Sequence, residues 1–273
     1  MVVQNQAVGF RDVDTASDSS DLIRYLRITS ESEPVRVRAR ARLARSGITP
    51  GGVIADLGCG LGTDTVLLAR HVAPGGGRVF ALDRSRAMLD YASARPELTG
   101  LPIEFREGDV HRLPFEDASL DGVWMERVLI HAEDPGVVLA EVARVLRPGG
   151  RAALCETSHH GTTYDSPDRE LSDQIAAVNQ ASLRNPWVGP ALPRLLRQAG
   201  FGAVELLPEF LLLPQDFELA AAAFRWREAL PRLTAEGGVT EERAQAWWSG
   251  MRTAADEGVL VCALPLFTAF ATR

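Results

Sequence analysis

The feature that most constrains this 273-residue chain is a glycine-rich loop between a short apolar run and a helical pattern. Residues 53–64 read Val-Ile-Ala-Asp-Leu-Gly-Cys-Gly-Leu-Gly-Thr-Asp. Residues 53–57 show no helical spacing, whereas residues 63–72 carry apolar side chains at steps of three and four. The order is therefore strand, tight loop and helix. Because glycine lacks a Cβ, such a loop can turn sharply and let a ligand approach its backbone.

Strand and helix patterns continue to alternate beyond this loop. Asp134 and Pro135 start one helix as N-cap and first helical residue, and Arg147-Pro148-Gly149-Gly150 stops it. This alternation predicts an α/β fold with a doubly wound, mostly parallel sheet, whose site lies at the carboxyl ends of the strands. The expected strands are 78–82, 103–106, 120–125, 151–155 and 203–207, and the expected helices are 85–94, 135–146 and 191–198.

The positions of the glycines separate two kinds of nucleotide cofactor. A dinucleotide fingerprint Gly-x-Gly-x-x-Gly would need its third glycine at Thr63, but Gly62 comes one residue early. The chain also contains no Lys, so it lacks the Tyr-x-x-x-Lys pair of a reductase. The segment from Asp56 to Gly62 instead resembles the first motif of class I methyltransferases, which bind S-adenosylmethionine.

Three further segments extend this resemblance. Asp83 closes the apolar run 79–82, residues 103–110 end in Gly-Asp-Val, and residues 120–131 resemble the fourth-strand segment of ubiquinone-biosynthesis-like methyltransferases. The four motifs occur in order between Val53 and Glu156, which is far more specific than one glycine loop. The resemblance implies a Rossmann-like, seven-stranded sheet.

The resemblance also implies roles in cofactor binding. Asp83 would accept the ribose hydroxyls, although an N-cap of the next helix is the alternative and Ser85 could supply it equally well. Met88 would pack on adenine. Asp109 would accept from the adenine amine, with a turn-capping role as the alternative.

Other predicted contacts concern the methionine part of the cofactor. The backbone of Glu126 and Arg127 would face it, Asp56 would hold the loop and reach the amino group through water, and Tyr25 would belong to an N-terminal lid. The complete set of predicted cofactor-binding residues is Tyr25, Asp56, Gly58, Cys59, Gly60, Gly62, Asp83, Arg84, Met88, Asp109, Val110, Glu126 and Arg127.

Four residues are candidates for catalysis. Some related small-molecule O-methyltransferases use a His in the loop after strand four together with an acid at the end of strand five, which correspond to His131 and Glu156 here. Such a pair could take a proton as the methyl group moves. A loop histidine bonded to backbone is the alternative for His131.

His159 and His160, just past Glu156, are further candidates as base, substrate contact or surface residues. No metal site is predicted, because the side chains of adjacent histidines point to different faces of an extended chain.

The chain divides into four predicted parts: an N-terminal helical arm or lid (1–47), a Rossmann-like core (48–215), a helical cap inserted late (216–258) and a final strand (259–273). Breaks in the cap are expected at Pro231 and at Gly237-Gly238. The cap would enclose the site.

Composition narrows the partners. A net charge of −7 lacks a basic footprint for nucleic acid, and no apolar stretch approaches the ~18 residues of a membrane span. The three cysteines have no ligand spacing. We therefore expect a cytoplasmic monomer or homodimer that acts on a small molecule, with no nucleic acid or membrane partner.

The predicted function is methylation of a small molecule at oxygen, nitrogen or carbon by in-line transfer from S-adenosylmethionine, in specialised bacterial metabolism. One alternative is a protein that binds S-adenosylmethionine and catalyses a cyclisation or rearrangement without methyl transfer. An NAD-dependent reductase and a pure interaction module are further alternatives, which the loop and the four motifs together disfavour.

Overall fold

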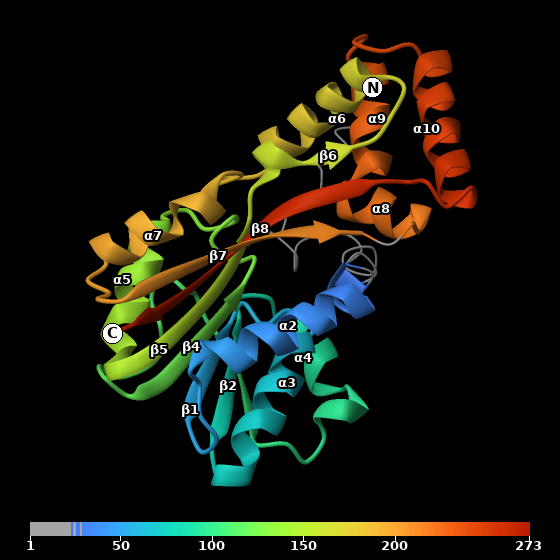
Figure 1. Ribbon diagram of the computed structural model, residues 1–273. Helices are drawn as coiled ribbons and strands as arrows, with labels where there is room; N and C mark the ends of the chain where they lie inside the picture. The colour runs from blue at the N-terminus through green and yellow to red at the C-terminus, as the bar shows by residue number, and fades with distance from the viewer. Residues whose placement is uncertain (1–22, 24–25, 28, 214) are drawn as a thin grey trace.

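The computed structural model describes residues 23, 26–27, 29–213 and 215–273 (Figure 1). Tyr25 lies outside the described residues. The helices and strands, in chain order, are α2 (Glu33–Ser46), β1 (Val53–Leu57), α3 (Thr63–Val72), β2 (Arg78–Asp83), α4 (Arg86–Ser93), β3 (Ile103–Glu107), β4 (Leu120–Glu126), α5 (Pro135–Val145), β5 (Leu146–Thr157), β6 (Thr163–Tyr164), α6 (Arg169–Ala181), α7 (Val188–Gln198), β7 (Val204–Leu212), α8 (Phe217–Ala223), α9 (Trp226–Ala235), α10 (Glu241–Asp256) and β8 (Cys262–Thr272).

Within the described residues, eight strands form one open sheet in the order β3-β2-β1-β4-β5-β8-β6, and β7 also pairs with β8. Strands β1 to β5 are parallel, and β8 runs antiparallel to both β5 and β7. The predicted α/β fold with a mostly parallel sheet is confirmed. The eighth strand is the two-residue β6, which pairs with the start of β8.

Helices cover both faces of the sheet because successive side chains of a strand point to opposite sides. On one face, Leu43 of α2 and Leu68 of α3 pack with Ile54 and Trp124. On the other, residues of α5 and α7 pack with Leu57 and its neighbours. The loops that follow β1, β2 and β4 therefore meet at one edge of the sheet.

The predicted start of α5 is confirmed by its capping bonds. Asp134 Oδ1 accepts hydrogen bonds from the backbone N–H groups of Gly136 and Val137, and Pro135 occupies the first turn. The same cap fixes the end of the loop that contains His131, which lies three residues earlier in the sequence.

A helical lobe, made of α6, α8, α9 and α10, stands beyond the sheet, and the long strands β7 and β8 extend into it (Figure 1). Its interior holds Trp226, with Tyr164 and Trp247 edge-on to it at centroid distances of 5.6 and 5.0 Å. Leu171 and Ile175 bring α6 into the same apolar cluster. The lobe thus draws on residues on both sides of the predicted cap boundary at 216, and the domain boundaries stay a prediction.

The predicted helix break at Pro231 is wrong. Helix α9 continues through Pro231, which removes only one backbone N–H from the ladder. The break lies instead between α8 and α9, where Arg225 has a left-handed φ of 51°. Sequence reasoning missed it because Arg carries no turn signal.

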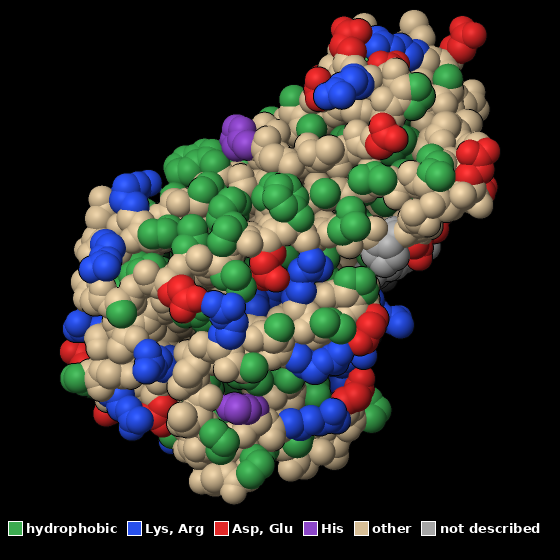
Figure 2. All heavy atoms as spheres, in the orientation of Figure 1, with side chains coloured by type: hydrophobic (Ala, Val, Ile, Leu, Met, Phe, Trp, Pro, Cys, Tyr) green, Lys and Arg blue, Asp and Glu red, His purple; other side chains and the backbone are tan. Residues whose placement is uncertain are grey.

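Charged side chains of both signs are interspersed over the visible surface (Figure 2). The arginines of α2 include Arg38 and Arg45, which form ion pairs with Glu209 and Glu205 of β7. In the described part of the chain, no helix combines the length and apolar character needed to cross a bilayer.

Candidate active site

A cavity of about 240 Å³ lies where the carboxyl ends of the parallel strands meet the helical lobe. Its loop half is lined by residues that follow β1 to β4: Gly58, Gly60, Asp83, Arg84, Met88, Gly108, Asp109, Val110, His111, Glu126, Arg127 and Val128. Its lobe half is lined by Ile130, His131, Ala132, Thr157, His159, Asn179, Ser182, Leu183, Leu211, Leu213, Leu219, Ala223, Phe224, Arg225, Leu264 and Leu266. Most of the predicted site residues therefore share one cavity.

The glycine loop forms the floor of the loop half. Gly58 has a φ of 71°, and a Cβ there would lie 2.5 Å from Val128 Cγ2. Gly60 has a φ of 50°, with no atom within 4 Å of the position that its Cβ would occupy. The backbone N–H groups of Gly58 and Cys59 donate to Leu82 O, which fixes the loop on β2. The turn therefore needs glycine and leaves open space above its backbone.

Two predicted loop residues do not line the cavity. Gly62 is the N-cap of α3, where a Cβ would lie 3.1 Å from Leu98 Cδ1. Cys59 is buried against Ala81 and Leu89, and this burial raises the pKa of its thiol well above the usual value. Both residues support the loop on the side that faces away from the cavity.

Asp83 faces the cavity at the end of β2. Its Oδ2 accepts from Gly60 N at 2.8 Å, and its Oδ1 accepts from Ser85 N at 2.9 Å. Burial raises the pKa of Asp83, against the lowering effect of these backbone bonds. Ser85 Oγ provides the N-cap of α4 by accepting from Met88 N. Each Asp83 oxygen has lone pairs beyond its backbone bond, which suits a pair of neighbouring hydroxyl groups.

Asp109 follows β3 on the same side of the cavity. Its Oδ1 accepts from the backbone N–H of His111 and lies 2.7 Å from Nδ1 of the His111 ring. Partial burial alone would raise the pKa of Asp109, but these contacts with His111 lower it. The turn-capping role considered from the sequence is thus present, and it keeps the carboxylate ionised in the cavity wall. His111 itself was missed by sequence reasoning, although it lies two residues from Asp109.

Asp56 lies beneath the loop and does not line the cavity. It is 2% exposed and accepts from Thr65 Oγ1 at 2.6 Å, which ties β1 to the first turn of α3. Burial raises its pKa to about 8, and the neighbouring charge of Asp64 adds to the shift. Because Asp56 is not among the cavity-lining residues, its predicted contact with the cofactor's amino group through water stays a prediction.

Two arginines of α2 line the cavity and were not predicted as site residues. Arg42 is 2% exposed and its Nη2 lies 2.5 Å from Glu126 Oε2. Its guanidinium also lies 5.8 Å from the Trp124 ring centroid. Arg38 lines the cavity one helical turn away. Their spacing of four residues, within a run of arginines, is the sequence signal that could have found them.

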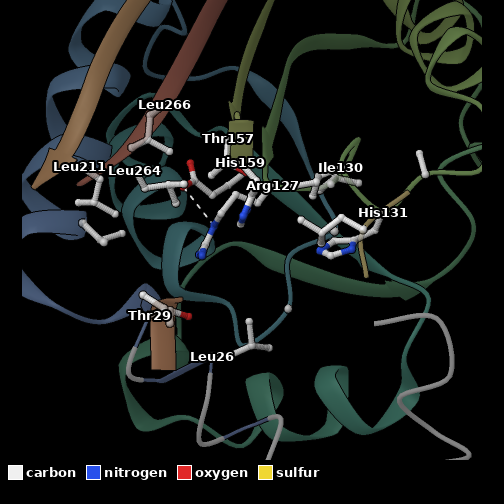
Figure 3. A pocket seen from close by; sticks show the side chains of 18 of the residues that line it. Leu26, Thr29, Arg127, Ile130, His131, Thr157, His159, Leu211, Leu264 and Leu266 are labelled. Carbon is white, nitrogen blue, oxygen red and sulfur yellow. Dashed lines mark ion pairs between the residues drawn. The ribbon is translucent and has the colours of Figure 1, made fainter. Parts of the chain in front are cut away.

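Arg127 connects the cavity to the N-terminal helical residues. It adopts a left-handed φ of 56°, and its Nη2 donates to Ser30 Oγ at 2.8 Å. Leu26 and Thr29 line the cavity from the same N-terminal segment (Figure 3). These contacts place an N-terminal segment over the loop half, and the role of Tyr25 in a lid stays a prediction.

The predicted pairing of Glu156 with the His131 side chain is wrong. Glu156 is fully buried, and its carboxylate accepts from the backbone N–H groups of Val128, Leu129 and Ile130. Burial raises its pKa to about 8, although the three backbone bonds lower it. Glu156 lies outside the cavity lining and holds the backbone of the loop that carries His131.

The three candidate histidines differ in their access to the cavity. His131 and His159 both line it, and Figure 3 shows His131 apart from the group that contains Arg127 and His159. Burial, together with the charges of Arg225 and Arg127, lowers the pKa of His159 to about 4, so its imidazole is neutral at physiological pH. His160 is exposed and does not line the cavity, because the short turn at 159–161 directs it to the surface. This position does not support a catalytic role for His160, which stays a prediction.

Comparison with known proteins decides the family. Residues 55–154 match the family described as "Methyltransferase domain". The chain is 35% identical over 205 residues to a demethylmenaquinone methyltransferase from Lactococcus lactis, covering 69% of this chain and 81% of that protein. The chain belongs to the family of S-adenosylmethionine-dependent methyltransferases.

Two further comparisons bear on this methyltransferase. It is 40% identical over 190 residues to an uncharacterised 37.1 kDa protein of transposon Tn4556 from Streptomyces fradiae, covering 69% of this chain but only 54% of that protein. Its fold matches a phosphoethanolamine N-methyltransferase from Haemonchus contortus with a TM-score of 0.62 and 18% identity, over 97% of this chain and 61% of the other. The domain match and the relative from Lactococcus lactis confirm the predicted family and its cofactor, and the structural match confirms the fold.

Proposed function

We propose that this methyltransferase transfers the methyl group of S-adenosylmethionine to a small, largely apolar acceptor. The observation that carries the proposal is that one cavity joins the loop half to a lobe half rich in leucine. A donor bound in the first half would share a dry space with an acceptor bound in the second. The demethylmenaquinone methyltransferase relative, named for a small-molecule acceptor, supports this.

The loop half fits the donor. The open space above Gly60 leaves room for a ligand against the backbone, and Asp83 offers a carboxylate to the ribose hydroxyls. Met88 and Asp109 flank the place where adenine would lie. Asp83 and Asp109 bring carboxylates to this lining, whereas the carboxylate of Glu126 is paired with Arg42 and Arg127.

S-adenosylmethionine supplies an already activated methyl group, whose bond to sulfur breaks as the bond to the acceptor forms. The chain's own task is to align the acceptor and exclude water. Glu156 fixes the backbone of residues 128–130, which places His131 in the cavity wall. We assign His131 the removal of the acceptor proton during transfer.

Several finer statements belong to the same proposal. The acceptor atom is oxygen, nitrogen or carbon, and the reaction belongs to specialised bacterial metabolism. The protein acts in the cytoplasm as a monomer or homodimer. The alternative function, a rearrangement without methyl transfer, would leave S-adenosylmethionine unconsumed.

A turnover experiment tests the proposal. The protein is incubated with S-adenosylmethionine and a panel of phenols, quinols and aliphatic acids, and methylated product and S-adenosylhomocysteine are quantified together. Equal amounts of the two are expected. An unmethylated product of unchanged mass, formed without S-adenosylhomocysteine, would instead support the rearrangement.

The role of His131 is tested in the same assay. His131→Asn is expected to lower kcat by roughly 10²-fold or more, because general-base catalysis contributes on that scale. His160→Asn, an exposed neighbour outside the cavity, serves as the matched control and should keep the wild-type rate. An unchanged kcat–pH profile in His131→Asn would show that His131 is not the base.

A further inference from the structure

The lobe half of the cavity has one polar wall. Most of its lining is leucine and other apolar side chains. Apart from His131 and Thr157, its polar residues are Asn179 and Ser182 at the end of α6, Arg225 at the junction of α8 and α9, and His159 in the turn after β5. A wall of this kind in an apolar chamber fixes the orientation of a ligand more than its affinity. Its chemistry therefore bears on which acceptor can bind.

Arg225 occupies this wall through an unusual backbone conformation. Among the described residues, the non-glycine residues with positive φ are Ala118, Arg127 and Arg225. Two of the three are arginines that line the cavity. Left-handed backbone at a non-glycine residue is unfavourable and tends to persist where the surroundings impose it, as at functional sites. The α8–α9 break thus places a guanidinium in the lobe half.

Among the described residues, the partners of Arg225 differ from those of Arg38, Arg42 and Arg127. Arg225 Nη1 donates to Ser182 Oγ at 3.2 Å, and no carboxylate of the described residues lies within ion-pair distance. Three other cavity-lining arginines, Arg38, Arg42 and Arg127, each have a glutamate partner.

The neighbourhood of Arg225 is electropositive. The lowered pKa of His159 has burial as its main cause, followed by the charges of Arg225 and Arg127. Both guanidiniums are therefore close enough to His159 to disfavour a further positive charge there. The same field would favour a negative charge on a ligand.

The geometry points to an apolar acceptor that carries, apart from the atom to be methylated, an acidic oxygen that Arg225 binds as its anion. This inference rests on the proposed function, because it assigns the lobe half to the acceptor. A guanidinium and an oxyanion form charge-assisted hydrogen bonds, which are stronger than neutral ones, and a largely apolar chamber strengthens them further. The apolar body of the acceptor would contact Leu211, Leu264 and Leu266.

A pair of probes that differ in charge tests this inference. Binding of 2-naphthoate and of its neutral counterpart 2-naphthamide to the protein saturated with S-adenosylhomocysteine is measured by calorimetry. Wild type is expected to bind the carboxylate about tenfold or more tightly than the amide. Arg225→Asn should abolish this preference, and Arg225→Lys should keep part of it. Asn tolerates left-handed backbone, and Arg225→Gly provides a second neutral variant without strain.

Arg232→Gln is the matched control, because Arg232 is an exposed arginine of α9 paired with Glu236. It should keep the full preference for the carboxylate. Equal binding of the two probes by wild type, no binding of either, or a preference that survives in Arg225→Asn would overturn the inference. Failure of S-adenosylhomocysteine itself to bind wild type would count against the proposed function. In that case, the preference for 2-naphthoate over 2-naphthamide, measured without S-adenosylhomocysteine, would still test the role of Arg225.

Discussion

The two halves of the cavity are built in different ways. The loop half comes from turns directly after four parallel strands, and each functional side chain there lies within a few residues of a strand end. The lobe half combines the loop after β4 with parts of α6, β7, α8 and β8, which are far apart in the sequence. Local sequence therefore specifies the proposed donor site, whereas only the tertiary fold specifies the proposed acceptor site. A substitution in one half should therefore change the affinity for the ligand of that half and leave the affinity for the other ligand unchanged.

The largest expected effect of breaking one half concerns Asp83. Asp83→Asn is expected to weaken binding of S-adenosylhomocysteine about 100-fold, because hydrogen bonds to a charged group contribute roughly 1.5–3 kcal/mol each. Affinity for 2-naphthoate should change little. Calorimetric titration of each ligand measures both effects.

Asp90→Asn is the matched control for this change. Asp90 lies on the exposed side of α4, where it pairs with Arg86. Exposed pairs contribute little to stability, so both affinities should stay at the wild-type value. Equal S-adenosylhomocysteine affinities in wild type and Asp83→Asn would remove Asp83 from the donor site.

A smaller effect, on the other ligand, is expected from Leu264 in the lobe half. Leu264→Ala removes buried apolar contact area and should weaken 2-naphthoate binding about fivefold to tenfold, with the affinity for S-adenosylhomocysteine unchanged. Val259→Ala is the control, since Val259 is 56% exposed. A Leu264→Ala protein that loses S-adenosylhomocysteine affinity while keeping its affinity for 2-naphthoate would refute the division into halves.

A further effect, on stability rather than on binding, concerns Glu156, which supports the junction of the two halves. Its folded-state pKa of about 8 lies above the ordinary value of 4.5, so the folded state holds a proton that the unfolded state releases. The stabilising contribution is complete below pH 4.5 and is lost as the pH rises through 8. The free energy of unfolding should therefore fall by up to about 1.4 kcal/mol per pH unit in this window.

Glu156→Gln should flatten that pH dependence, as measured by urea unfolding at several pH values. Asp56 has a similarly raised pKa and contributes a parallel loss in both proteins, so their difference isolates Glu156. Glu236→Gln, on the exposed side of α9, should keep the wild-type slope. Identical slopes for wild type and Glu156→Gln would mean that Glu156 is already ionised in the folded state.

The sequence predicted the sheet and most of the loop half because these depend on short-range signals. Gly58, Gly60 and Asp83 could be placed from the strand–loop–helix pattern alone. Glu156 was assigned to the correct strand end, but its burial under three backbone N–H groups depends on a loop about 26 residues away. No local pattern reports such a contact.

The lobe half escaped prediction for a related physical reason. Arg225 reaches the cavity through a helix break that has no Gly or Pro, and Arg42 does so because α2 packs across the sheet. His160 was predicted as a site residue because it follows His159 in the sequence, yet the side chains of consecutive residues in a turn point in different directions. Side-chain direction in such segments follows from tertiary packing, which hydrophobic periodicity does not encode.

A crystal structure with S-adenosylhomocysteine bound tests the central claim most directly. The ribose hydroxyls are expected within hydrogen-bond distance of Asp83, adenine beside Met88 and Asp109, and the sulfur facing the half lined by His131 and Leu264. A ligand seated among the leucines of the lobe half, with no contact to Asp83, would contradict the assignment of donor and acceptor sites.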